Sequence, residues 1–254
     1  MWFEDDEVER LREVFNKEHP HKTPIPRGSA DATWRELQQR FHEECRTGNA
    51  SCIISRMIHK PKVPEAWIVN RYEWLSSDDI AAVEKEYMKL FGDYTFLGTV
   101  PIDFNLHSET GECLVSTLCR TRLDKLYDEG YHKIGIIFNT DPHDGPGEHW
   151  VALFADIRPE LEHARITYFD SYAQKPEKEI QALMRRWKEE LDSRGIHPKP
   201  VELSYNKTRH QFKNSECGMY CLYFHYCCLL GIPMEQRMPD DIVNRLRNLL
   251  FRRK

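Results

Sequence analysis

Four polar residues in the second half of the chain have the types and the spacing that nucleophilic catalysis requires. Cys217 stands at the start of an apolar, helix-like run, where the helix dipole and neighbouring N–H groups favour a thiolate. His149 opens a strand-like run and could take the thiol proton, and Asp170 closes the next such run and could orient the imidazole. Gln211, six residues before Cys217, could donate a side-chain N–H to an oxyanion. These residues indicate acyl transfer by a Cys-His-Asp triad.

The two strand-like runs suggest how His149 and Asp170 could meet. They read HWVALFADI and RITYFD, and in an antiparallel hairpin the start of one strand lies beside the end of the other. His143 is an alternative base in the Pro- and Gly-rich loop DPHDGPGE, but it lacks the strand placement of His149. Asn214 or Ser215 is a plausible N-cap for the helix that starts at Cys217.

A metal site is the alternative reading of the Cys217 helix. Cys217, Cys221 and His225 recur every four residues and would share one helical face. However, the sequence contains no C-x-x-C pair, and structural zinc usually takes its ligands from two short-spaced pairs. We therefore do not interpret this set as a zinc site: Cys221 reads as a core thiol, Cys217 remains the candidate nucleophile, and we expect neither a metal nor another cofactor.

Composition excludes several classes of protein. The 254 residues are 40% hydrophobic and 30% charged, with a formal net charge of −5, which is ordinary for a globular protein. The basic segment RLRNLLFRRK is best explained as a final amphipathic helix with a solvated face. Nucleic acid is therefore an unlikely substrate and at most an accessory.

The beginning of the chain and its apolar runs bear on the compartment. MWFEDDEVER is acidic and lacks the positive and apolar regions of a secretory signal. No apolar run approaches the roughly 18 residues of a membrane span. We expect a protein that is not secreted and does not cross a membrane, with its eight cysteines reduced in a cytosolic-type compartment.

The order of the elements predicts an α+β fold. Apolar residues at helical spacing over 8–15 and 34–41 predict two helices, and the punctuated HKPKVPEAW sets a boundary near residue 64. We predict a helical N-terminal extension over 1–64 and a catalytic domain over 65–254. Within the latter we expect helices over 76–92, 118–127, 176–191 and 217–230 and at the C-terminus, with strands over 133–140, 149–157, 165–172 and 200–206.

Several of these segments resemble one protein superfamily. EHWVALFADI, YFDSY and Q-x5-CGMY are similar to the signature of the ubiquitin-like-protein (SUMO) proteases and adenain. The resemblance implies a permuted papain-like core, with a central mixed, mainly antiparallel sheet flanked by helices. It also implies a cysteine protease with His149, Asp170 and Cys217 as its triad and Gln211 at the oxyanion.

A further segment, EWLSSDDI, resembles the WLND segment of the same superfamily. There, one tryptophan in this segment and one after the catalytic histidine enclose a narrow slot for a Gly-Gly substrate end. The resemblance implies that Trp74 and Trp150 form such a slot here.

FLGTVPIDF and GIIFNTDPHDGPGEHWVALFADI look like the virion cysteine proteases of large DNA viruses of the asfarvirus and iridovirus type. The implied task is processing of structural polyproteins after Gly-Gly motifs during virion maturation, in the virion and the host cytoplasm. Two alternatives remain: deconjugation of SUMO or another ubiquitin-like modifier, in the cytoplasm or nucleus, and a catalytically silent module that binds Gly-Gly tails.

Overall fold

The computed structural model describes residues 5–42, 45, 50–57 and 60–252. Its elements are α1 (Asp5–Glu18), α2 (Ala30–Arg40), α3 (Ala50–Met57), η1 (Glu65–Ile68), α4 (Ser77–Leu90), β1 (Tyr94–Pro101), α5 (Ser116–Arg120), α6 (Leu123–Asp128), β2 (Lys133–Asn139), β3 (Trp150–Asp156), β4 (Arg165–Phe169), α7 (Lys178–Arg194), β5 (Glu202–Tyr205), α8 (Cys217–Leu229) and α9 (Asp240–Leu250). Within the described ranges, no helix has the length and apolar character that crossing a membrane requires.

The centre of the fold is a mixed five-stranded sheet in the order β1-β2-β3-β4-β5. The pairs β2–β3 and β3–β4 are antiparallel, and the outer pairs β1–β2 and β4–β5 are parallel. The predicted α+β class with a mixed central sheet is therefore confirmed. Strand β1 was not predicted, because its register shifts between Phe96 and Thr99 around Gly98, which has a positive φ of 113°. Such a bulge interrupts the alternation that marks a strand in sequence.

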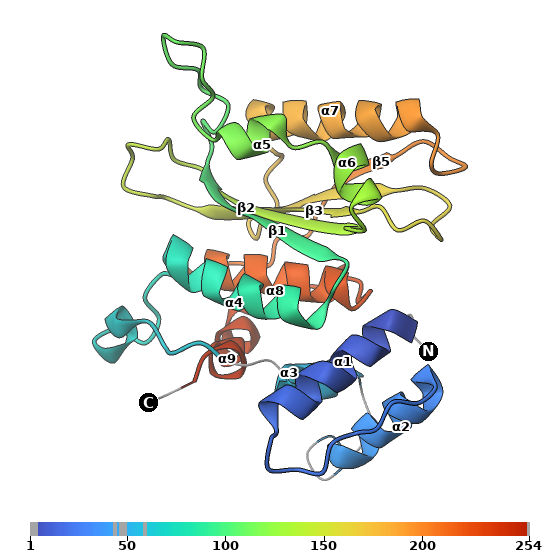
Figure 1. The fold of residues 1–254 in the computed structure, drawn as a ribbon. Coiled ribbons are helices and arrows are strands. Elements are labelled where there is room, and N and C mark those ends of the chain that lie inside the picture. The colour runs from blue at the N-terminus through green and yellow to red at the C-terminus, as the bar shows by residue number, and fades with distance from the viewer. Residues whose placement is uncertain (1–4, 43–44, 46–49, 58–59, 253–254) are drawn as a thin grey trace.

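Helices cover both faces of this sheet (Figure 1). Alternate side chains of β2 and β3 point to opposite faces, as the two-residue period of a strand requires. On one face, Ile136 and Leu153 join the cluster that contains α7, while Ile137 and Ala152 join the cluster that contains α4 and α8. The apolar stripe of α7 predicted from sequence is buried: Ile180, Leu183, Met184, Trp187 and Leu191.

The N-terminal helices pack against the α4 side of the molecule. Val8 and Phe15 of α1 belong to the same hydrophobic cluster as α4 and α8. The buried Lys133 at the start of β2 pairs with Glu7 of α1 at 2.8 Å and with Asp93 at 3.2 Å. The predicted boundary near residue 64, between an N-terminal extension and a catalytic domain, stays a prediction. These contacts show how the two segments pack against each other, but they do not define where the first ends.

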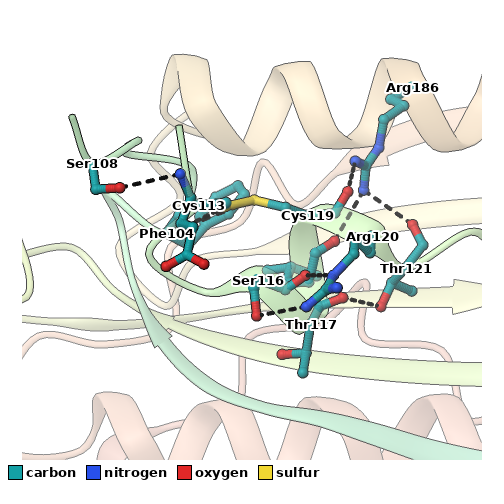
Figure 2. The surroundings of a disulfide bond; sticks show 11 residues. Phe104, Ser108, Cys113, Ser116, Thr117, Cys119, Arg120, Thr121 and Arg186 are labelled. Carbon is teal, nitrogen blue, oxygen red and sulfur yellow. Dashed lines mark hydrogen bonds between the residues drawn. A yellow bond between two sulfur atoms is a disulfide. The ribbon is translucent and has the colours of Figure 1, made fainter. Parts of the chain in front are cut away.

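One predicted helix is two in the structure. Instead of a single helix over 118–127, α5 ends at Arg120, and Thr121 takes an extended conformation before α6. Arg186 of α7 donates to the carbonyl oxygens of Leu118, Cys119 and Thr121 at 2.7–3.2 Å, so it satisfies groups that a continuous helix would bond internally (Figure 2).

The expectation that all eight cysteines are thiols is wrong for four of them. Cys45–Cys52 and Cys113–Cys119 are disulfides, with Cα atoms 5.9 and 6.6 Å apart, and Figure 2 shows the second. Both separations lie in the range that a disulfide bridges. Composition could not predict this, because it does not tell which cysteines lie within bridging distance of one another. The four remaining thiols all lie in α8: Cys217, Cys221, Cys227 and Cys228.

Candidate active site

His149 and Asp170 lie at the same end of two neighbouring strands. His149 immediately precedes β3, Asp170 immediately follows the antiparallel β4, and Ala152 pairs with Phe169. His149 Nε2 is 2.7 Å from Asp170 Oδ1. The structure therefore brings these two side chains together at the position that a hairpin predicts.

The carboxylate of Asp170 is held from several directions. Its Oδ1 accepts the backbone N–H of Tyr172 and its Oδ2 that of Gln174, both at 2.9 Å. Asn206, which directly follows β5, forms two hydrogen bonds with the main chain of Asp170. The Asp170 N–H donates to Asn206 Oδ1 at 2.9 Å, and Asn206 Nδ2 donates to the Asp170 carbonyl at 2.7 Å. Sequence reasoning missed Asn206, although its place at the end of a strand beside β4 is a usable signal.

Cys217 is the first residue of α8 and is only 1% exposed. The predicted caps Asn214 and Ser215 are wrong: the N-cap is Glu216, and it makes no side-chain capping bond. The first-turn N–H groups of α8 are therefore not taken by a capping side chain, which leaves them available to an anion.

The imidazole of His149 interacts with both Asp170 and Cys217. Burial lowers the pKa of His149, but the hydrogen bonds with Asp170 and with Cys217 together outweigh this effect. The pKa of His149 is therefore raised to about 9. Since Nε2 faces Asp170, Nδ1 is the nitrogen left for the thiol. Tyr172, a second residue that sequence reasoning missed, places its ring over the imidazole at a centroid distance of 4.9 Å.

The side-chain amide of Gln211 is fully buried and oriented. Its Oε1 accepts the hydroxyl of Ser171 at 2.6 Å, and its Nε2 donates to the carbonyl of Lys213 at 2.9 Å. The Gln211 N–H also donates to the Ser171 carbonyl at 2.9 Å, which ties it to the residue after Asp170. A primary amide has two N–H donors, and the bond to Lys213 uses one.

Trp74 and Trp150 line one surface pocket of about 560 Å³. Trp150 is 8% exposed and donates from its indole to the Leu75 carbonyl at 3.0 Å, whereas Trp74 is 36% exposed. A Cβ on Gly218 would lie 3.3 Å from Trp150 Cδ1, so this ring packs against the residue that follows Cys217. The rest of the wall is Leu75, Ser76, Ser77, Thr99, Val100, Pro101, Asn139, Pro142, His143, Gly145, Pro146 and Gly147.

His143, the alternative base, lies in the wall of this pocket, and its side chain contacts Asp103. Its Nδ1 is 2.7 Å from Asp103 Oδ2, and its backbone N–H donates to Asp103 Oδ1 at 2.9 Å. The hydrogen bond with Asp103 raises the pKa of His143. His143 thus holds the 141–147 loop against the segment after β1.

The periodic Cys217, Cys221 and His225 have separate surroundings. His225 is fully buried; its Nδ1 is 2.7 Å from Glu84 of α4, and its Nε2 is 3.2 Å from the Leu153 carbonyl. Both ring nitrogens of His225 thus have protein partners, which accounts for a buried histidine in α8. Within the described part of the chain, no group of three or more His, Cys, Asp or Glu could hold a metal ion.

A buried polar network fixes the chain on either side of the site. The Glu216 carboxylate accepts from Asn244 Nδ2 at 2.7 Å, and Arg247 of α9 donates to Asn244 Oδ1 at 2.8 Å. Arg247 also donates to the carbonyls of Glu73 and Ser215, each at 2.9 Å. Burial lowers the pKa of Arg247 to about 10 against the opposing effect of Glu216. One guanidinium thereby positions both the Trp74 segment and the residues before Cys217.

The first prediction concerns the four thiols of α8. Burial raises the pKa of Cys221 and raises that of Cys227 to about 11, so both are poor nucleophiles at neutral pH. We expect iodoacetamide to label Cys217 first, because it alone faces His149 at a helix start. Peptide mapping of the folded protein checks this. Cys228 is the most exposed of the four, so labelling of Cys228 first would mean that exposure alone controls reactivity.

The second half of the chain is similar to known cysteine proteases. Residues 132–253 match the Ulp1 protease family, C-terminal catalytic domain. A protein of Acanthamoeba polyphaga mimivirus that is assigned as a thiol protease is 32% identical over 184 residues, which are 71% of this chain and 57% of that protein. African swine fever virus proteins named cysteine protease or SUMO-1 cysteine protease are 33–34% identical over 122 residues, 46% of this chain and 43% of theirs. The chain thus spans about half the length of these relatives.

The fold is shared with a solved structure. The crystal structure of the African swine fever virus protease matches with a TM-score of 0.64 and 18% sequence identity, over 100% of this chain and 92% of that one. At this identity the match establishes the overall fold alone.

Proposed function

Through residues 132–253 this chain belongs to the Ulp1 family of cysteine proteases, and we propose that it is an endopeptidase that cuts after Gly-Gly motifs. The observation that carries the proposal is the bond between His149 and Asp170, 2.7 Å long, beside the helix that begins with Cys217. The pocket lined by Trp74 and Trp150 adjoins this helix start and supplies a place for two small residues.

The proposed reaction passes through a thioester. The Cys217 thiolate attacks the carbonyl carbon of the second glycine, and the oxyanion accepts hydrogen bonds from the Cys217 backbone N–H and from Gln211 Nε2. His149, held by Asp170, gives its proton to the leaving amine as the carbon–nitrogen bond breaks. It then takes a proton from water, which attacks the thioester and releases the acid product and the thiolate. No cofactor takes part in these steps.

We propose viral structural polyproteins as the substrates, cleaved during virion maturation in the virion and the host cytoplasm. Similarity to mimivirus and African swine fever virus proteins supports this choice. A second candidate is processing of a ubiquitin-like modifier, which the name SUMO-1 cysteine protease of viral relatives favours. Purified protein with Gly-Gly peptides and with ubiquitin-like fusions, and Cys217→Ala as the control, separates the two.

The second prediction concerns pH. Because the pKa of His149 is raised to about 9, its imidazolium persists through neutral pH, and the proton for the leaving amine is lost only above that value. We expect kcat/KM for a Gly-Gly peptide to fall above about pH 9. In Asp170→Asn, the alkaline limb should move down toward the ordinary histidine pKa of 6.5, because a carboxylate no longer stabilises the cation. An alkaline limb that is the same in both enzymes would assign it to another group.

The third prediction tests the slot. If Trp74 and Trp150 close over the substrate backbone, Gly→Ala at either of the two positions before the cut should lower kcat/KM by about tenfold to a hundredfold, since a methyl group overpacks the slot. Trp74→Ala should then lose this discrimination while staying folded, because Trp74 is already 36% exposed. Peptide kinetics and thermal melting measure the two properties.

Trp67→Ala is the matched control for the slot. Trp67 lies in the same segment but packs against Phe251 at a centroid distance of 5.0 Å and under the Arg247 guanidinium at 4.5 Å. This variant should melt early and keep its preference for Gly-Gly. A Trp74→Ala enzyme with full Gly-Gly discrimination and a lowered melting temperature would make Trp74 a packing residue instead.

A further inference from the structure

Arg209, Phe212 and Arg237 form an exposed cation–π cluster next to the proposed active site. The Phe212 ring is 58% exposed. The Arg209 guanidinium carbon lies 4.6 Å from the centroid of this ring, and that of Arg237 lies 4.4 Å from it. Two like charges thus share one surface ring, which creates a local positive field in a chain of net charge −5.

Ring contacts connect this cluster to the catalytic histidine. The Arg209 guanidinium also lies over the Tyr172 ring, 5.3 Å from its centroid, and the Tyr172 ring lies over that of His149 at 4.9 Å. Arg209 Nε donates to the carbonyl of Gln211 at 2.9 Å. The cluster is therefore separated from the imidazole by a single aromatic ring, and it is continuous with the residue proposed to bind the oxyanion.

The two guanidinium groups keep donors for a ligand. Arg209 Nε is bound to Gln211, and Arg237 Nε donates to the His210 carbonyl at 3.3 Å. Neither forms an ion pair with a carboxylate among the residues that the structure describes. The adjacent carboxylate, Asp240, is 5% exposed and accepts the Phe212 N–H at 3.1 Å and the Tyr220 hydroxyl at 2.9 Å. The planar Nη groups can thus receive a carboxylate in bidentate geometry.

We propose that this cluster binds acidic side chains of the substrate segment that follows the scissile bond. The inference rests on the proposed function, in which the residues before the cut occupy the pocket of Trp74 and Trp150. The cluster is not part of that pocket. It lies beyond the Tyr172 ring as seen from His149, the group that donates a proton to the leaving amine. The leaving segment therefore departs toward Tyr172, Arg209 and Phe212. Charge complementarity then selects carboxylates over neutral or basic side chains.

The test compares two peptides that differ only after the cut, one with Gly-Gly followed by Asp-Glu and one with Gly-Gly followed by Asn-Gln. We expect a higher kcat/KM for the acidic peptide by about fivefold or more at low salt, the upper range for one exposed charge pair. The preference should shrink as salt screens it. Arg209→Gln/Arg237→Gln should bring the ratio near one, and Arg209→Glu/Arg237→Glu should favour a Lys-Lys peptide. Because the readout is a ratio within each enzyme, a general loss of activity cancels.

Arg165→Gln is the control, because this exposed arginine begins β4, at the end of the strand opposite Asp170. It should keep the wild-type ratio. If the double variants do not fold, Arg237→Gln alone should still lower the ratio. This variant removes one of the two guanidinium groups and leaves the contact between Arg209 and Tyr172 in place. A ratio near one in the wild type, or an equal ratio in wild type and variants, overturns the inference and leaves Gly-Gly cleavage standing. Failure to cleave either peptide overturns the proposed function as well.

Discussion

Cys217→Ala should abolish cleavage of Gly-Gly peptides, with a loss in kcat/KM of at least about 10⁴-fold. The reason is structural as well as chemical: no other thiol of α8 combines a helix-start position with contact to His149. Cys221 is the matched control, since it lies one turn later in the same helix and burial raises its pKa. Cys221→Ala should retain cleavage of the same peptide. Steady-state kinetics with product identification by mass spectrometry measures both variants.

Cys217→Ala also distinguishes an enzyme from a catalytically silent binding module. Calorimetry with a Gly-Gly peptide should show that Cys217→Ala still binds, because the pocket of Trp74 and Trp150 remains. Cleavage that survives in Cys217→Ala would place the nucleophile elsewhere. A wild-type protein that binds the peptide without cleaving it would instead favour the binding module.

Asp170→Ala should lower kcat/KM by about 10³–10⁴-fold. The change removes the 2.7 Å bond that orients His149 and one of the interactions that raise its pKa. Asp170→Asn should be milder, because an amide oxygen can still accept from His149 Nε2. However, the new amide NH₂ group would face the backbone N–H of Tyr172 or Gln174, and two donors cannot form a hydrogen bond with each other. We therefore expect some loss of kcat/KM.

Asp124→Ala is a suitable control for Asp170→Ala. Asp124 is another mostly buried carboxylate, paired with Arg122 at 2.9 Å in α6, on the face of the sheet opposite α8. It should affect stability without changing kcat/KM. An Asp170→Ala enzyme with unchanged kcat/KM would show that another group orients His149, and Tyr172 would be the residue to examine next.

Local patterns in the sequence predicted many of the features that depend on neighbours along the chain, although not strand β1 or the N-cap of α8. Helix α4 begins where acids follow Ser76, because Ser76 and Asp79 form a capping box within four residues. The strand ends at His149 and Asp170 and the helix start at Cys217 are likewise readable from period and punctuation. Antiparallel strands need only a turn between them, so even the contact between His149 and Asp170 follows from local signals.

Tertiary structure alone decided the features whose partners are distant in sequence. Arg247 bonds to the Glu73 carbonyl across 174 positions and to the Ser215 carbonyl across 32. Asn206 grips Asp170 across 36 positions because β5 runs parallel to β4. No periodicity marks such residues, since each would serve equally well on a solvated surface. Only the packing of α9 and β5 against the core brings these polar groups to their partners, and burial of Arg247 makes its hydrogen bonds obligatory.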